Sequence, residues 1–265
     1  GGGDTGGSIQ RATFILRVVR EIGDRIPRLR LQERATPLAS PFTADILQPL
    51  YITLASHITQ PNLGKYKISL ANSLKVNTKS YILWEGHPPL PSQPSPNAFR
   101  FLRELDKSMG ALGSDLWAPS CVSVLKSQVA KELSGLVGEQ VDAIIARGQD
   151  DERGVEKPEK EDEEKEGEGE ETKEEKDDAN ATTKDDEKAK AAESLSELKN
   201  QRFKQLLFDL LYIQRFVEPN VEEEKITALR ERTEVGDLDE AAMSRLRKNA
   251  ADYAKKTYLL FALLA

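Results

Sequence analysis

The stretch NQRFKQLLFDLLYIQRFV, residues 200–217, decides the fold of this chain. It holds more apolar residues than one face of a helix can carry. They are Phe203, Leu206, Leu207, Phe208, Leu210, Leu211, Tyr212, Ile213, Phe216 and Val217. The run is too short for a membrane span, which needs roughly 20 apolar residues, and polar residues interrupt it. We therefore predict a central helix that is packed on at least two sides.

A strongly acidic segment precedes this helix. Residues 150–190 hold 20 Asp and Glu against 9 Lys and Arg, so the acidic net charge of −7 belongs to this segment. Residues 148–190 contain one valine and no Leu, Ile, Phe, Met, Trp or Tyr. A segment that buries nothing cannot offset its ordering entropy. We predict that residues 148–193 form a disordered acidic insertion.

Helical spacing of apolar residues dominates the remaining chain. It predicts helices over 8–34, 41–59, 97–109, 120–147, 194–218, 221–232 and 237–265. In the first of these, Phe14, Ile15, Val18, Val19, Ile22 and Ile26 form the apolar stripe. Residues 64–86 suit helix or strand, and without an evident partner strand we expect a helix that breaks near Asn77.

Prolines, glycines and capping residues set the expected boundaries. Pro27 should end or kink the first helix, Pro49 should bend or split the second, and Pro61-Asn62 should form a turn. The expected caps are Asn97, Ser120 and Asp237, and the expected stops of the 97–109 helix are Gly110 and Gly113.

These elements predict an all-α fold, an elongated bundle or rod of about six to eight helices with a long acidic loop. Residues 1–8 lack a starting Met and suggest a linker end, with the chain a C-terminal piece of a longer protein. An N-terminal helical part covers 9–86, and a stiff proline-rich connector covers 87–96. Residues 97–147 and 194–265 form the C-terminal bundle.

No motif in the sequence indicates a catalytic, metal or cofactor site. The histidines, His57 and His87, have no Cys or carboxylate at ligand spacing, so neither a metal site nor a cofactor is expected. Cys121 lies among apolar neighbours and predicts a buried structural thiol. There is no phosphate-binding glycine loop, and the low pI of 5.2 argues against nucleic acid as a partner. We therefore expect a protein without catalytic activity.

Two segments allow an interaction role. The PxxP pairs at Pro88–Pro91 and Pro91–Pro94 could be an SH3 ligand, although a connector between helices is the favoured interpretation. A basic helix face could meet anionic lipid or an acidic partner. It comprises Arg11, Arg17, Arg20 and Arg25.

The C-terminal third resembles a known family. Residues 205–212 read QLLFDLLY, and after a polar spacer residues 256–264 read KTYLLFALL. Together with PSPNAFRFLRELDKSMGALGSDLWAPSCVSVLKSQVAKEL further upstream, these segments resemble the C-terminal region of subunit 1 of the conserved oligomeric Golgi complex. The likeness covers about residues 92–265 except the acidic run. Ala262 stands where glycine is common in that family, and the acidic run is longer than its usual linker.

The resemblance implies a non-catalytic scaffold built as a rod of stacked helical bundles. Its place would be the cytosolic face of the Golgi membrane, in a tether for retrograde intra-Golgi vesicles. It would bridge the lobe of subunits 2–4 to the other lobe, with subunit 8 as a direct partner. The alternative is a peripheral lipid-binding module that uses the arginine-rich first helix.

The apolar surplus marks a set of residues that serve either the core or a partner interface, and the sequence leaves the two open. They are Phe203, Leu207, Leu210, Leu211, Leu259, Leu260 and Phe261.

Overall fold

The computed structural model describes residues 5–25, 43–73, 84–155, 178–217, 226–228, 230–231 and 238–264. Among these residues the chain is helical almost throughout, apart from one pair of two-residue strands, which confirms the predicted all-α helical bundle. The elements are α1 (Thr5–Arg25), the π-helical η1 (Thr43–Leu47), α4 (Gln48–Ser73), β1 (Trp84–Glu85), β2 (Leu90–Pro91), α5 (Pro96–Leu112), the 3₁₀ turn η2 (Ser114–Leu116), α6 (Pro119–Val155), α7 (Asp178–Val217), α9 (Glu240–Thr257) and the 3₁₀ turn η3 (Tyr258–Phe261).

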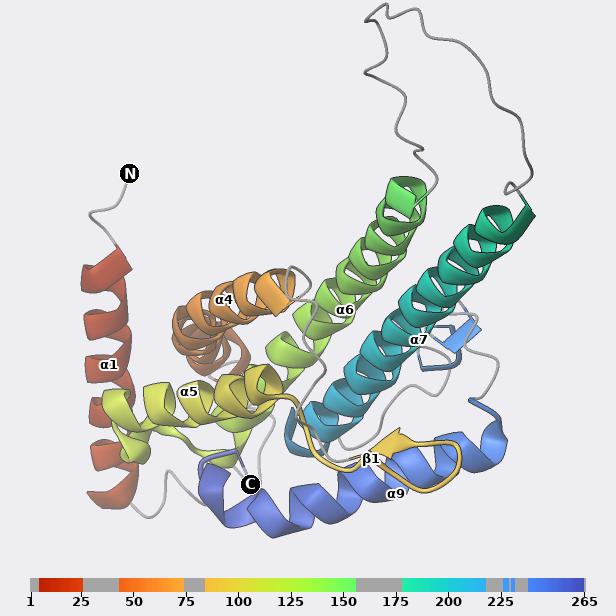
Figure 1. Cartoon of the computed structure of the whole chain (residues 1–265). Helices are drawn as coiled ribbons and strands as arrows, with labels where there is room; N and C mark the ends of the chain where they lie inside the picture. The colour runs from red at the N-terminus through yellow and green to blue at the C-terminus, as the bar shows by residue number, and fades with distance from the viewer. Residues whose placement is uncertain are drawn as a thin grey trace, which may run out of the picture.

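Two long antiparallel helices, α6 and α7, form the spine of the bundle (Figure 1). α4 packs on α6 and α5 on one side, and α9 crosses α7 on the other. α1 stands at the edge, where it touches α4 and η2 (Figure 1). The spine brings the early and late parts of the sequence into one core.

α7 lies at the centre of that core. All ten apolar side chains of residues 200–217 are buried, with exposed fractions between 0% and 6%. α6 covers one side of the helix with a stripe that includes Val129, Leu133 and Val137, and α9 and β2 cover the others. The prediction of a central helix packed on at least two sides is confirmed, since no single face holds these side chains.

The predicted turn at Pro61-Asn62 is wrong, because α4 continues through Pro61 to Ser73. Ile58, Leu63 and Tyr66 are buried on either side of the proline and face the same core. A proline inside a helix costs about 3 kcal/mol. Burying several large apolar side chains can offset that cost, since each contributes about 1.5–3 kcal/mol. The predicted bend or split at Pro49 corresponds to a change of helix type, because the π-helical η1 ends at Leu47 and α4 begins at Gln48.

Several predicted caps move by a few residues. Ser95, and not Asn97, caps α5: its hydroxyl accepts the Ala98 N–H at 3.2 Å, and Pro96 takes the first helical position. α5 continues past Gly110 and stops at Gly113, whose φ of +119° suits glycine. α6 begins at Pro119 rather than after a Ser120 cap.

The last helix has its cap two residues later than predicted. Asp239 replaces Asp237, and its carboxylate accepts the Ala242 N–H at 2.7 Å. Both residues are acidic and precede an apolar run, so local sequence gave no way to choose between them.

The proline-rich connector is a hairpin rather than an extended rod. Trp84–Glu85 pairs with Leu90–Pro91 in antiparallel fashion, so a partner strand exists that we had not expected. Gly86 turns the chain with a φ of +80°. The expected helix over 64–86 therefore holds as far as Ser73 and fails at Trp84, while the break near Asn77 lies outside the described residues.

The helices reach further into the acidic segment than predicted. α6 runs to Val155 and α7 starts at Asp178, so both ends of the predicted insertion, 148–193, are helical. Acidic residues near a helix start interact favourably with its dipole, and low apolar content alone does not end a helix. Residues 156–177 lie outside the described part. α1 likewise begins at Thr5, inside the predicted linker end.

Candidate partner-binding surface

The C-terminal turn η3 is held in place by an aromatic cluster. The ring of Phe261 meets Phe99 of α5 at 5.5 Å and Phe216 of α7 at 5.1 Å, both edge to face. Tyr212 of α7 extends the cluster through its contacts with Phe216 and Tyr253. Edge-to-face ring pairs stabilise by about 0.5–1.5 kcal/mol beyond their buried area. The cluster fixes the end of the chain to three helices.

Two hydrogen bonds fix the orientation of the C-terminal segment. The hydroxyls of Tyr212 and Thr257 lie 2.8 Å apart in the core, where burial raises the pKa of Tyr212. The Leu263 N–H donates to Asp106 Oδ1 of α5 at 3.0 Å, and Leu264 is fully buried. The segment from Thr257 to Leu264 therefore has one orientation relative to α5 and α7.

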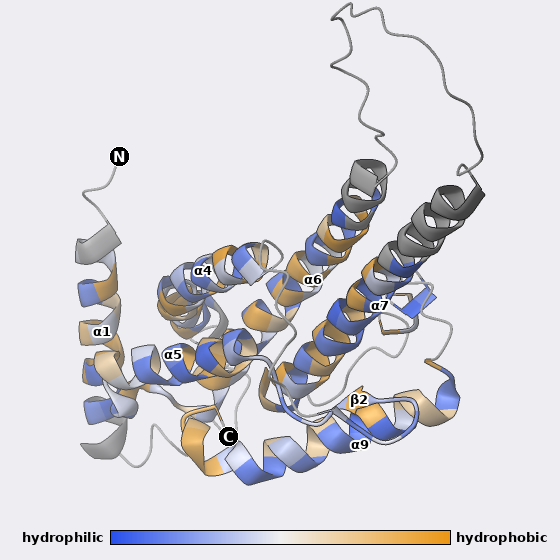
Figure 2. Cartoon of the chain, in the orientation of Figure 1, coloured by the Kyte–Doolittle hydropathy of each residue, from blue (hydrophilic) through white to orange (hydrophobic). Residues whose placement is uncertain are grey.

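That orientation turns three large apolar side chains outward. Tyr258 is 50% exposed, Leu259 87% and Leu260 60%. We call these three residues the η3 edge. Hydrophobic colour gathers at this turn beside the C-terminus, in contrast to the polar outer side of α9 (Figure 2). Adjacent exposed apolar residues on a rigid turn are typical of an interaction site.

The structure thus divides the seven residues that the sequence marked as core or interface. Five of them, Phe203, Leu207, Leu210, Leu211 and Phe261, are buried in the core of the described chain. Leu259 and Leu260 are exposed. Sequence reasoning missed Tyr258, because the helical pattern of residues 237–265 hides the change to a 3₁₀ turn after Thr257.

The QLLFD motif serves packing. Asp209 is buried, and its Oδ1 accepts the Ser95 N–H at 2.7 Å and the Gln205 side-chain amide at 2.9 Å. The same amide of Gln205 donates to Gln93 O at 3.1 Å. Burial raises the pKa of Asp209 to about 6, although these hydrogen bonds oppose the shift. The motif attaches the proline-rich connector to α7.

The connector is also bound by α9, which leaves little of it for an SH3 partner. Arg245 donates to His87 O at 2.7 Å and to Pro88 O, and Asn249 donates to Pro91 O at 3.1 Å. Pro91 and Pro94 are buried. The geometry therefore fits the favoured interpretation of residues 87–96 as a connector.

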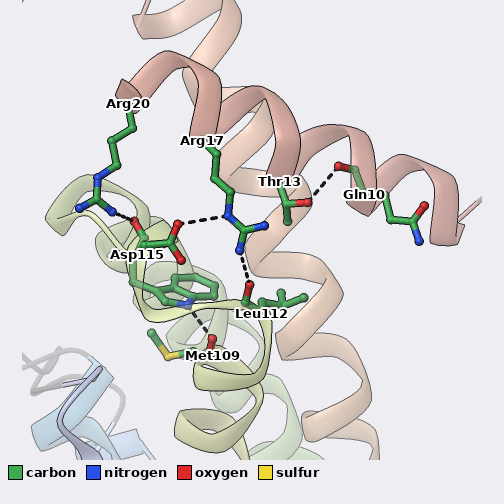
Figure 3. Close-up of polar contacts among 8 residues, drawn as sticks. Gln10, Thr13, Arg17, Arg20, Met109, Leu112 and Asp115 are labelled. Carbon is green, nitrogen blue, oxygen red and sulfur yellow. Dashed lines mark hydrogen bonds and ion pairs between the residues drawn. The ribbon is translucent and has the colours of Figure 1, made fainter. Parts of the chain in front are cut away.

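The arginines of α1 mostly contact their own chain. Arg17 donates to Asp115 Oδ2 at 3.1 Å and to Leu112 O at 3.0 Å, and Arg20 donates to Asp115 O at 2.6 Å (Figure 3). The hydrogen bond from Arg17 lowers the pKa of Asp115. Arg11 donates to Gly7 O within α1, and the side chain of Arg25 lies outside the described residues. Of the four arginines, the three whose side chains are described, Arg11, Arg17 and Arg20, all donate hydrogen bonds within their own chain.

The predicted apolar stripe of α1 is wrong in part: Val19 packs against the core, but Phe14, Ile15 and Val18 do not. Ile9, Ala12 and Leu16 are buried against the bundle. Phe14 and Val18, which we expected in the apolar stripe of the core, are 68% and 38% exposed. Ile15 is exposed as well. The buried Ile9, Ala12 and Leu16 define the face of α1 that packs on the bundle, and Arg17 and Arg20 add surface hydrogen bonds to η2 and the end of α5.

The residues considered for chemistry are the two histidines and the single cysteine. His57 and His87 are exposed and far apart in sequence. Cys121 is buried, and burial raises the pKa of its thiol to about 12, as expected of a structural thiol. Within the described ranges no group of three or more His, Cys, Asp and Glu residues could hold a metal ion.

None of the helices, as far as the chain is described, is long and apolar enough to traverse a bilayer. No protein-family model, curated protein or solved structure matches this chain significantly. The candidate site therefore rests on the geometry of the η3 edge.

Proposed function

We propose that this chain is a non-catalytic scaffold subunit of a multisubunit tethering complex at the cytosolic face of the Golgi membrane. In this role it bridges sibling subunits, subunit 8 and the lobe of subunits 2–4, for retrograde intra-Golgi transport. The resemblance of residues 205–212 and 256–264 to subunit 1 of the conserved oligomeric Golgi complex motivates the proposal. The complex needs surfaces that bind protein, and the η3 edge offers one.

The observation that carries the proposal is the split within residues 256–264. Phe261 and Leu264 are fully buried. Leu259 and Leu260, which lie between the end of α9 and Phe261 in the sequence, are exposed. The buried residues anchor the turn, so the exposed residues are already ordered before a partner binds. Less conformational entropy is therefore lost on binding. Contacts of this kind concentrate binding energy in a few apolar anchors.

The test is co-precipitation of the affinity-tagged chain with its sibling subunits from cells. The doubly substituted Leu259→Asp, Leu260→Asp chain should recover subunit 8 at least about tenfold less, because each buried leucine contributes about 1.5–3 kcal/mol. Circular dichroism should show unchanged helix content and thermal midpoint. Ile68→Asp is the matched control, since Ile68 is 64% exposed on α4, away from η3.

Two results would count against the proposal. The first is the absence of all sibling subunits from the precipitate of the unchanged chain. The second is flotation of the chain with anionic vesicles, lost in an Arg17→Glu, Arg20→Glu variant that still folds. That result would favour the lipid-binding alternative, in which the arginines of α1 contact lipid headgroups rather than Asp115 and Leu112.

A further inference from the structure

Positively charged side chains lie on the two helices that contact η3. Lys255 and Lys256 end α9 directly before it and are exposed. On the other side, α5 presents Arg103 and Lys107, also exposed. We call these four residues the basic rim. The η3 edge and the basic rim together form a small apolar surface with cations on two sides.

The register of α5 places the rim beside η3. Phe99 touches Phe261, and Asp106 accepts the Leu263 N–H at 3.0 Å, so both residues lie on the side of α5 that faces η3. Arg103 is four residues after Phe99 and three before Asp106, which puts it on neighbouring surface of the same helix. Lys107 is four residues beyond Arg103 and continues this row.

Ion pairs neutralise little of the charge of the basic rim. Glu104 and Asp106 of α5 lie beside Arg103 and Lys107 in the sequence but form no ion pair with them in the described chain, and Asp106 Oδ1 accepts the Leu263 N–H. Lys255 Nζ lies 3.7 Å from Asp252 Oδ1, and these side chains are 80% and 49% exposed, so solvent screens the pair. Arg103, Lys107 and Lys256 form no ion pair with any residue in the described ranges. The surface therefore favours a ligand with negative charge beside its apolar part.

We propose that the η3 edge binds an amphipathic helix whose apolar stripe is flanked by Asp and Glu. The inference rests on the proposed function and adds the chemistry of the partner segment. A helix in this position lays two or three apolar residues at i, i+3 and i+4 on Leu259 and Leu260. Its acidic flanks then face Lys255 and Lys256 on one side and Arg103 and Lys107 on the other. Opposite charges across such a rim speed association and fix the orientation.

A protein helix fits this surface better than a membrane does. The exposed apolar area consists of three side chains on a turn fixed by Phe261 and Leu264. Rigid, small clusters are typical of protein hot spots. Stable membrane attachment needs either a longer amphipathic helix or a second signal. Anionic lipid remains a distinct outcome of the experiment.

The experiment places a photoreactive side chain on the edge. The full chain with Leu259→p-benzoylphenylalanine is expressed in its native cells, irradiated and purified, and the crosslinked peptide is identified by mass spectrometry. We expect one dominant product, a peptide with helical apolar spacing and Asp or Glu on both flanks of its stripe. Ile68→p-benzoylphenylalanine is the control position and should not give this product.

A charge-reversal pair tests the rim separately. Adding Arg103→Glu and Lys107→Glu to the photoreactive chain should lower the yield of the crosslinked product about tenfold. Added salt should also lower the yield from the photoreactive chain whose basic rim is unchanged. Lys65→Glu with Lys131→Glu, two exposed cations elsewhere, is the matched control and should leave the yield unchanged.

The outcomes separate this inference from the proposed function. A product peptide without acidic flanks, a lipid adduct, or no product at all overturns the inference. Co-precipitation of sibling subunits in the same samples would then leave the proposed function standing. An acidic amphipathic product from a protein outside the tethering complex would support the inference and contradict the proposed function.

Discussion

α7 and α1 are both helices with more apolar residues than one face needs, yet the bundle treats them differently. α7 buries all ten apolar side chains of residues 200–217 between α6, α9 and the connector hairpin. α1 buries Ile9, Ala12 and Leu16 and leaves Phe14 exposed. Arg17 and Arg20 hold α1 by contacts at the surface. The number of neighbouring elements, and not apolar content, decides how much of a helix is core.

The largest effect should come from truncating the centre of α7. Phe203→Ala should lower the free energy of unfolding by about 3–5 kcal/mol, because it removes a fully buried ring and leaves a cavity. Urea denaturation followed by circular dichroism measures the loss. Phe14→Ala is the matched control on α1 and should change stability by no more than about 0.5 kcal/mol. Equal losses from the two substitutions would remove the contrast between the helices.

Truncating the buried face of α1 should have a smaller and more local effect. Leu16→Ala should cost about 2–3 kcal/mol, the lower part of the range for leucine, because Leu16 is 8% exposed at the edge of the bundle. Hydrogen exchange should accelerate in residues 5–25 well before it accelerates in α7. If exchange rises equally in both helices, α1 does not open independently of the spine.

The buried carboxyl of α7 predicts a dependence on pH. The pKa of Asp209 is about 6 in the fold, against about 3.9 unfolded, so the folded protein holds the proton more tightly. The stability from this group is complete below pH 4 and is lost as the pH rises through 6. The Asp209→Asn variant has no titrating group at this position. The free energy of unfolding of the variant, minus that of the unchanged chain, should therefore rise by about 2 kcal/mol from pH 4 to pH 7. A constant difference across this range would contradict the burial of a titrating Asp209.

The smallest effect should come from the ion pair that holds α1. Arg17→Met should cost about 0.5 kcal/mol at low salt, because both side chains of the Arg17–Asp115 pair are about half exposed and solvent screens them. The cost should disappear at about 1 M salt, where the screening length is about 3 Å. A loss that survives high salt would show that the ion pair is not the main contribution of Arg17, and that its hydrogen bond to Leu112 O or its packing is.

Much of the fold could be predicted from local pattern, and the errors have physical causes. The helices α5, α6 and α7 follow from their periodic apolar residues, and Gly113 ends α5 as expected. The turn predicted at Pro61 was wrong, because tertiary packing outweighs the cost of a proline inside a helix. The hairpin at Trp84 was missed because its partner is a proline-rich stretch that rarely forms a strand.

The candidate site shows the same division more sharply. Residues 258–261 read YLLF, and nothing local distinguishes the buried Phe261 from the exposed Leu259 and Leu260. The difference comes from Phe99 and Phe216, which lie far away in the sequence and enclose one ring.

The sequence by itself determined that the chain is helical, that residues 200–217 lie in its core, and that Cys121 is a buried thiol. Periodicity and apolar content decide these features, and they act between residues close along the chain. Only the tertiary structure decided the rotation of α1, the attachment of the connector by Asp209, and the exposure of the η3 edge. Each of these depends on contacts between residues some 45 to 160 positions apart, which no local pattern records.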